Sequence, residues 1–180
     1  MNCWKSININ RQYGVHRITG VSLIITLLAF IMIFLSFSLI FSQHDVSSKY
    51  FILFLFALIC IPTTHKFFHA LPVVLSNKKV CFSWRLQFCL PFLTIKSEQP
   101  FSKLQSYVIF LMPFIAITVI LTVLTFMLPA YFHYFSILLA FNIGLSVPDF
   151  LYLKQINSAP RACQIEEIEN GYDILIMNEE

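Results

Sequence analysis

Charged side chains are scarce in this sequence: Lys, Arg, Asp and Glu make up 12% of its 180 residues, whereas 58% of the residues are hydrophobic. A typical soluble domain is about 25% charged and about 45–50% apolar. The shortage of charge argues against a soluble globular enzyme, and the excess of apolar residues argues against a disordered chain. A bilayer-spanning helix takes about 20–25 residues, so the apolar residues are enough for about four such helices.

Patterns that mark several other classes of protein are missing from the sequence. No block of Lys and Arg residues is present and the net charge is only +3, so nothing indicates a nucleic-acid partner. The five cysteines are odd in number, form no C-x-x-C pair and fit no zinc module, so we expect free thiols. The sequence also contains no C-x-x-C-H motif, which would indicate a haem site.

Four long apolar runs predict four transmembrane helices. These runs lie at about 18–41, 50–75, 104–128 and 131–153. They predict a membrane domain over 18–153 with a polar connector at 76–103, preceded by an N-terminal segment at 1–17 and followed by a tail at 154–180. The first run is longer than the apolar part of a signal peptide, and no cleavage site of small residues follows it, so we expect it to be retained.

The distribution of basic residues predicts the orientation of the four helices. Ten of the twelve Lys and Arg residues fall in the N-terminal segment, the connector and the tail, which a four-span chain places on one side. Of the other two, Lys49 falls on the opposite side and Lys66 within a helix. The positive-inside rule therefore places both termini in the cytoplasm, and the lipid bilayer is the first expected partner.

Two segments outside the apolar runs resemble strands. Residues 80–90 alternate apolar and polar side chains, which indicates a half-buried strand, and Asn170-Gly171 in the tail indicates a hairpin turn. The first segment is either a strand lying on the membrane or a sheet edge that pairs with an extended peptide. The residues of this candidate peptide edge are Phe82, Trp84 and Leu86. Together with the apolar runs, these segments predict an all-α polytopic membrane protein with a small cytoplasmic β element.

Ionisable residues inside the apolar runs are rare, and they are therefore candidate functional residues. His65 and His69 are four residues apart, so they share one face of a helix. His65 lies about 22 Å and Asp149 about 25 Å from the outer ends of their runs, at 1.5 Å per residue. The two residues are therefore expected at a similar depth in the membrane. A metal ion shared by these three residues would neutralise the carboxylate. A buried Lys66–Asp149 pair would do the same, and two hydrogen-bonded histidines would need no metal.

Asn142 and Gly144 precede Asp149 in the fourth run. Asn142 shares the helix face of Asp149, where it can support a ligand, bind a substrate backbone or hydrogen-bond a neighbouring helix. Gly144 permits close helix approach. Two His and one carboxylate are the ligand set of a catalytic zinc site, which hydrolyses amide bonds when a nearby base takes a proton from water.

Four parts of the chain together carry a family resemblance. They are His65-Lys66-Phe67-Phe68-His69, the connector residues Pro100, Ser102 and Lys103 with Pro113-Phe114, the set Asn142, Gly144 and Asp149, and the tail with Pro160 and Asn170-Gly171. They resemble the motifs of small bacterial membrane proteins of the "putative zincin peptidase" family, which are similar in plan to the site-2 proteases. The resemblance implies one zinc ion held by His65, His69 and Asp149, a peptide or membrane protein as substrate, and the bacterial plasma membrane as location.

Lys66 departs from that family's pattern, because the family has Glu after the first His and this Glu is the general base. A protonated lysine cannot accept the water proton, and it repels a zinc ion. Three hypotheses follow: a degenerate metallopeptidase homologue that keeps metal or peptide binding, an active metallopeptidase with another base, and a non-enzymatic four-helix membrane protein. The last would bind ions, act as a small carrier or bind a partner. The sequence predicts neither the substrate nor the oligomeric state.

Overall fold

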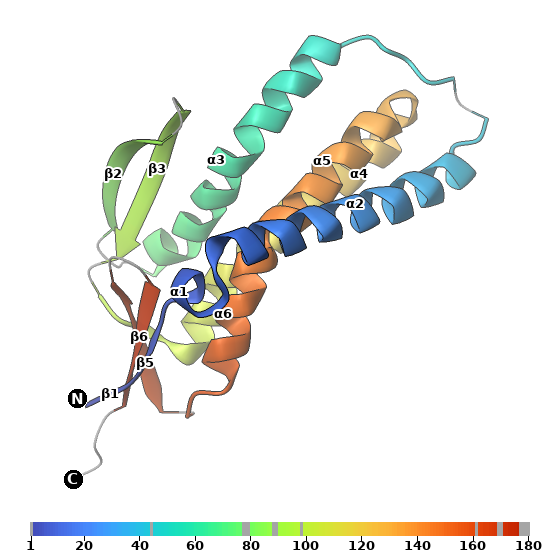
Figure 1. Ribbon diagram of the computed structural model, residues 1–180. Coiled ribbons are helices and arrows are strands. Elements are labelled where there is room, and N and C mark those ends of the chain that lie inside the picture. The colour runs from blue at the N-terminus through green and yellow to red at the C-terminus, as the bar shows by residue number, and fades with distance from the viewer. Residues whose placement is uncertain are drawn as a thin grey trace.

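The computed structural model describes residues 2–43, 45–76, 80–87, 90–97, 99–160, 162–168 and 171–176, and of 80–87 and 90–97 it describes the backbone. The structure is mostly helical. Its strands gather at one end of the helices, and the first and last strands of the chain both lie there (Figure 1).

Four helical segments are long and apolar enough to cross a membrane. They are α2 (Val15–Ile40), α3 (Phe51–Leu75), α4 (Lys103–Met127) and the broken segment Pro129–Asn157. Their length and composition come directly from the apolar runs, since about 20 apolar residues suffice for one span. The predicted fold class, four such helices with a small β element, is confirmed.

The fourth segment is broken, although the sequence predicted one helix over 131–153. It consists of the short 3-10 helix η1 (Pro129–Tyr131), α5 (Phe132–Leu145) and α6 (Val147–Asn157). The break falls at Ser146, and Pro148 follows in the first turn of α6, where its missing N–H removes no bond of the new helix. A new helix therefore begins just before Asp149, which lies in its first turn.

The N-terminal segment is more ordered than the sequence indicated. It forms a strand, β1 (Asn2–Ile7), and a short helix, α1 (Ile9–Tyr13). The side chain of Asn8 caps α1 by accepting a hydrogen bond from the backbone N–H of Arg11 at 2.9 Å. Gly14, at a φ of 81°, then turns the chain into α2, in a conformation that other residues rarely adopt.

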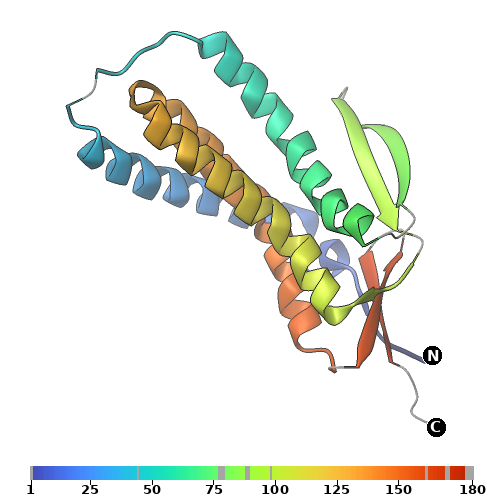
Figure 2. The ribbon, with the colours of Figure 1, turned by 180° about the vertical axis from the view of Figure 1, so that it is seen from behind.

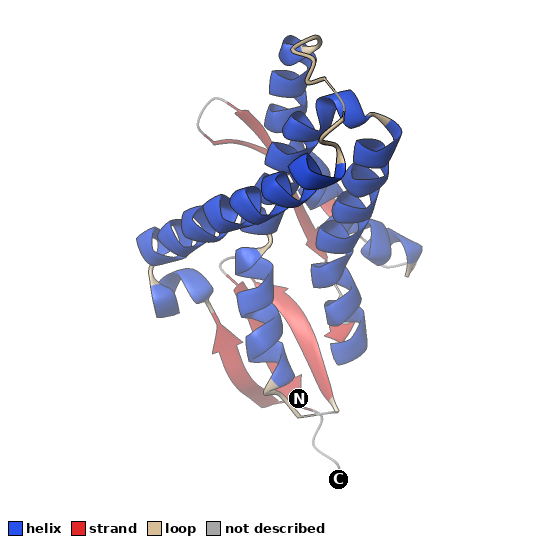
Figure 3. Ribbon diagram, turned by 90° about the vertical axis from the view of Figure 1, so that its right-hand side faces the viewer, coloured by secondary structure: helices blue, strands red, loops and turns tan. Residues whose placement is uncertain are grey.

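Strands from three parts of the chain form a four-stranded antiparallel sheet in the order β1-β6-β5-β4. Figure 3 shows most of the strands, in red, at the end of the molecule where both termini lie. Its other members are β4 (Phe101–Ser102), β5 (Cys163–Ile168) and β6 (Gly171–Ile176). The β5–β6 pair lies where the sequence predicted a tail hairpin, and Ile168 pairs with Gly171, whereas Asn170 lies outside the described residues. The sequence did not predict β1 or β4. The sheet therefore joins the N-terminal segment, the start of α4 and the tail.

A separate antiparallel pair lies beside the half of α3 that is nearer the sheet (Figures 1 and 2). It consists of β2 (Val80–Gln87) and β3 (Leu90–Ser97). The single strand predicted over 80–90 thus ends at Gln87, and residues 88 and 89 lie outside the described part of the chain.

Three clusters of buried apolar side chains hold the described elements together, and the smallest consists of Val73, Phe101 and Ile109. The sheet-end core joins α6 to the sheet and includes Ile7, Ile156, Ile165 and Ile174, each 0% exposed. The far-end core joins α2, α3, α4 and α5 at the end away from the sheet, and it includes Phe37, Phe41, Leu121, Phe132 and Leu139.

Helices α2 and α5 approach closely at Gly144. A Cβ atom at this position would collide with the hydroxyl of Thr26 and crowd the backbone carbonyl of Ser22, both on α2. Gly144 therefore serves helix packing, and it faces α2 rather than the polar residues described next.

Candidate metal centre

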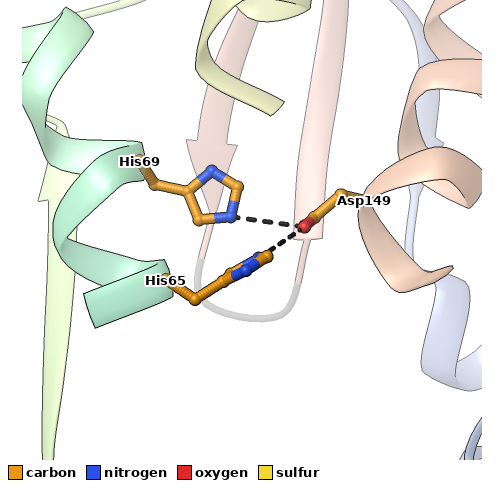
Figure 4. Close-up of side chains that lie close together, drawn as sticks. All are labelled: His65, His69 and Asp149. Carbon is orange, nitrogen blue, oxygen red and sulfur yellow. Dashed lines mark hydrogen bonds and ion pairs between the residues drawn. The ribbon is translucent and has the colours of Figure 1, made fainter. Parts of the chain in front are cut away.

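The side chains of His65 and His69, from α3, and of Asp149, from α6, come together between the two helices (Figure 4). Oδ2 of Asp149 lies 2.9 Å from Nε2 of His65 and 3.4 Å from Nε2 of His69. One potential ligand atom from each residue lies within 4.8 Å of the others. Among the described residues, this is the only group of three or more His, Cys, Asp or Glu side chains that meets this condition.

Local structure explains how three residues far apart in sequence converge. The four-residue spacing places both imidazole rings on one face of α3, with ring centroids 5.1 Å apart. Asp149 reaches them from the first turn of α6, a turn that exists because the chain breaks at Ser146. The positive end of the α6 dipole also favours a carboxylate at this position.

A hydrogen bond from α5 fixes the orientation of the His65 ring. Nδ1 of His65 lies 3.1 Å from Oδ1 of Asn142, which is 0% exposed. The amide nitrogen of Asn142 donates to Oγ1 of Thr118 at 3.3 Å and to the carbonyl of Phe114 at 3.5 Å. Because Asn142 thus presents its oxygen, Nδ1 of His65 must be the donor, and the Nε2 lone pair faces Asp149.

A backbone group from α4 fixes the orientation of the His69 ring in the same way. Nδ1 of His69 lies 2.8 Å from the carbonyl oxygen of Ile109. A carbonyl oxygen can only accept a hydrogen bond, so Nδ1 of His69 carries a proton. In a neutral imidazole the Nε2 lone pair is then the group that faces Asp149.

When both imidazoles are neutral, two lone pairs and one carboxylate oxygen face one another, and the 2.9 Å contact between Nε2 of His65 and Oδ2 of Asp149 is a hydrogen bond only if Nε2 also carries a proton. One added proton would make one ring a cation paired with the Asp149 carboxylate, whereas protonating both rings would place two cations beside one anion where His65 is 6% and Asp149 9% exposed. A divalent cation between the three atoms satisfies all of them at once. Imidazoles oriented through their second nitrogen are typical of metal ligands.

The two His–Asp separations are compatible with zinc, and the two His ligand atoms lie within 4.8 Å of each other. In a tetrahedral site with bonds of about 2.0–2.1 Å, neighbouring ligand atoms lie about 3.3 Å apart. The two His–Asp separations, 2.9 Å and 3.4 Å, bracket this value. Two imidazoles and a carboxylate also match the chemistry that zinc accepts, with a fourth position left for a further ligand.

Aromatic rings line the side of the site that faces the sheet. Phe110 packs edge-on against His69, with ring centroids 6.0 Å apart, and it stacks on Tyr152 at 5.5 Å. Tyr172, from β6, completes the cluster at 5.3 Å from Phe110 and 5.0 Å from Tyr152. Burial raises the pKa of the Tyr172 hydroxyl well above its usual range. The C-terminal hairpin is thus packed next to the site.

The other residues singled out from the sequence lie in different places. Lys66 follows His65 on α3 and is half-buried. Gly144 packs against α2. The candidate peptide-edge residues Phe82, Trp84 and Leu86 lie in β2, whose backbone pairs with β3, and their side chains lie outside the described part of the structure.

Sequence reasoning missed several groups of the site. It did not find the carbonyl of Ile109, because a backbone atom has no residue-type signature, or the aromatic cluster of Phe110, Tyr152 and Tyr172, because aromatic residues are common in apolar runs. One sequence signal for the open carbonyl was available: Pro113 lies four residues after Ile109 in α4 and has no N–H to donate to it.

Fold and site together define a helical protein with four potential membrane spans and a two-histidine, one-carboxylate cluster suited to a metal ion. The chain belongs to the family described as "putative zincin peptidase", which matches residues 58–164, more than half of its length. The match includes both histidines and Asp149. The family suggests a metallopeptidase-like function and zinc as the metal. Neither the search of curated proteins nor the search of solved structures returned a match.

Proposed function

We propose that this chain is an integral membrane, zincin-like metallopeptidase homologue, similar in plan to the site-2 proteases, in which peptide-bond hydrolysis is weak or lost. It binds one zinc ion through Nε2 of His65, Nε2 of His69 and the carboxylate of Asp149. The observation that carries this proposal is the convergence of these three atoms, with Nδ1 of each ring already committed to an acceptor.

Each residue of the site has its own task in this proposal. Zinc bound here would supply the Lewis acid that activates water for attack on a peptide bond. Asn142 holds the His65 ring, and the backbone of α4 holds the His69 ring. Low exposure of His65 and Asp149 strengthens their interaction with a cation, because few waters compete for it.

Lys66 is the reason for proposing weak or absent hydrolysis. It occupies the position after the first His, where the His-Glu-x-x-His motif has the carboxylate that accepts a proton from water. An ammonium group cannot accept that proton. The same residue favours the alternative function, a non-enzymatic membrane protein that uses the cluster to bind an ion or a partner.

We place the helices in a lipid bilayer, with the bacterial plasma membrane as the proposed location. Helix α2 supports this placement, because its apolar side chains are exposed on the protein: Leu27 is 60%, Met32 66% and Leu39 72% exposed. Large exposed apolar surfaces of this kind are rare on soluble monomers. By the positive-inside rule, the strands and both termini lie on the cytoplasmic side, and the site lies nearer that side than the outer one.

A peptide or a segment of a membrane protein is the proposed substrate or bound partner. The strand β2, which carries Phe82, Trp84 and Leu86, lies beside α3 and is the proposed edge for pairing with an extended chain. A Trp84→Pro variant removes a backbone donor from this strand. It should weaken crosslinking to a bound peptide without reducing membrane insertion, and unchanged crosslinking would contradict this role.

Metal content tests the proposed function first. We expect about one zinc per chain in the detergent-purified protein by mass spectrometry, and a loss of this zinc in a His65→Ala/His69→Ala variant. His133→Ala is the matched control, because His133 lies on α5 near its start, away from the cluster, and zinc should stay bound. No zinc in the parent chain would contradict the proposal.

Cleavage of a membrane-protein substrate by the zinc-loaded parent and a Lys66→Glu variant then tests catalytic competence. We expect little or no cleavage by the parent and more by Lys66→Glu, because the variant restores a carboxylate base. Efficient cleavage by the parent that His65→Ala abolishes would show that Lys66 does not disable the site.

A further inference from the structure

The partner of His69 Nδ1 is an unusual acceptor, because it is a backbone carbonyl in the interior of an α-helix. In an uninterrupted helix each carbonyl accepts a hydrogen bond from the N–H four residues later. The carbonyl of Ile109, inside α4, instead lies 2.8 Å from the imidazole of His69 on another helix. A carbonyl oxygen can accept two hydrogen bonds, so the residue four positions later decides whether this carbonyl also has its helical donor.

That residue is Pro113. It lies four residues after Ile109, inside α4, and its nitrogen carries no hydrogen. The helical donor for the Ile109 carbonyl is thus missing from the chain itself. Pro113 is fully buried and Ile109 is 9% exposed, so water is a poor substitute, and an unpaired buried carbonyl would be costly. The Nδ1–H group of His69 takes the place of the missing helical donor.

We infer that Pro113 is a positioning residue of the site: by removing the helical donor to the Ile109 carbonyl, it makes this carbonyl the acceptor for Nδ1 of His69. The ring is then held with its Nε2 lone pair toward Asp149. The two histidines are oriented in different ways, since His65 uses the side chain of Asn142 and His69 uses a backbone oxygen. The effect on metal binding rests on the proposed function, whereas the effect on the ring itself does not.

The plainer role for Pro113 is to bend α4 for packing. Helix α3 offers a control for this role, because Pro62 also lies in its interior and leaves the carbonyl of Leu58 without its helical donor. If any interior proline near the site mattered only through helix shape, Pro62→Ala and Pro113→Ala would act alike. If Pro113 acts through the Ile109 carbonyl, only Pro113→Ala restores an N–H that competes with His69.

Histidine-labelled protein examined by nitrogen-15 NMR tests the effect on the ring. The measurement uses metal-free full-length chain in an Asp149→Ala background, at a pH where the imidazoles are neutral, so that the carbonyl of Ile109 is the remaining partner of His69. We expect His69 to carry its proton on Nδ1. Adding Pro113→Ala should shift the population toward the Nε2–H form, and adding Pro62→Ala should not.

Several results would overturn the inference. If His69 carries its proton on Nε2 when Pro113 is present, the carbonyl of Ile109 does not set the tautomer; this arm requires no folded Pro113 variant. An unchanged tautomer in Pro113→Ala, or the same change in Pro62→Ala, would overturn it as well.

Zinc affinity in the chain with Asp149 intact measures the consequence for the metal. Changing an outer partner of a metal-bound histidine typically costs about 10-fold to 100-fold in affinity, and we expect a loss of this size for Pro113→Ala and little loss for Pro62→Ala. Equal affinities would contradict the role of Pro113 in the metal site. A parent chain that binds no zinc would instead contradict the proposed function, while the NMR comparison would still decide the inference.

Discussion

The sheet end and the far end of the helices bury different kinds of side chain. Near the sheet, the helices bury His65, Asn142 and Asp149, and each of these polar groups has a specific partner. At the far end they bury rings packed on rings, such as Phe41 and Phe132 with centroids 6.1 Å apart. The polar side chains buried at the far end, Thr125 and Ser136, bond only to carbonyls of their own helices, so packing there depends mainly on residue size. The sheet end needs defined atoms at defined positions, and that difference marks it as the functional region.

Replacing a proposed zinc ligand at the sheet end should have the largest effect on zinc affinity. Asp149→Asn keeps the size of the side chain but removes its charge, so we expect zinc affinity to fall by more than the 10-fold to 100-fold typical of outer partners. Competition with a zinc chelator in detergent measures this loss. A variant that keeps parental affinity would show that the carboxylate is not a ligand.

Loss of the acceptor on α5 should have the next largest effect. Asn142→Ala leaves Nδ1 of His65 without its partner, and we expect zinc affinity to fall about 10-fold to 100-fold, because the ring loses its fixed orientation. Ser136→Ala on the same helix is the control, since its hydroxyl bonds within α5 to the carbonyl of Phe132. Equal affinities in the two variants would contradict the role of Asn142.

At the far end, a large deletion should change stability without changing the metal. Phe132→Ala removes a ring that is 5% exposed, and we expect about 2 kcal/mol of destabilisation. This is below the about 3–5 kcal/mol seen in soluble cores, because lipid is as apolar as the protein interior. Unfolding by denaturing detergent measures it, and a drop in zinc affinity comparable to that of Asn142→Ala would remove the distinction between the two ends.

Replacing two glycines in the helices tests whether α2 and α5 are in close contact. Gly144→Ala forces a methyl group into Thr26 and the backbone of α2, and we expect about 1–3 kcal/mol of destabilisation from overpacking. Gly20→Ala on α2 is the matched control, because a Cβ there meets no atom within 4 Å, and higher helix propensity should stabilise it by up to about 1 kcal/mol. Similar unfolding midpoints would mean that α2 and α5 are not in close contact.

The smallest expected effect concerns pH. Because burial raises the pKa of Tyr172 in the folded chain, the neutral phenol contributes stability that is fully present below the unfolded pKa of about 10 and is lost as pH rises through the folded value. Tyr172→Phe should flatten this alkaline loss when thermal unfolding is followed above about pH 10. Parallel pH profiles of parent and variant would assign the loss to other groups.

The sequence predicts the far end better than the sheet end, for a physical reason. Apolar runs of spanning length indicate helices whatever their exact packing, so the four helices could be predicted from composition alone. The polar cluster could be predicted in outline, because a histidine pair and an aspartate stand out among apolar residues. What remained hidden depends on backbone geometry: the break at Ser146 that aims Asp149, and the carbonyl of Ile109 that Pro113 leaves open.

The strands show the same limit. The tail hairpin could be predicted from Asn170-Gly171, because this turn is local. The pairing of β1 with β6 could not, because it joins the two ends of the chain and depends on where the helices deliver them. The aromatic cluster beside the site depends on this sheet, since Tyr172 reaches Phe110 from β6.

The central claim is that His65, His69 and Asp149 hold zinc. X-ray absorption at the zinc edge of the detergent-purified chain tests it most directly. We expect one zinc bound by two imidazole nitrogens and a carboxylate oxygen at about 2.0–2.2 Å, with the imidazole signal lost in His65→Ala/His69→Ala. Purified chain without zinc, or a spectrum dominated by sulfur ligands at about 2.3 Å, would contradict the claim.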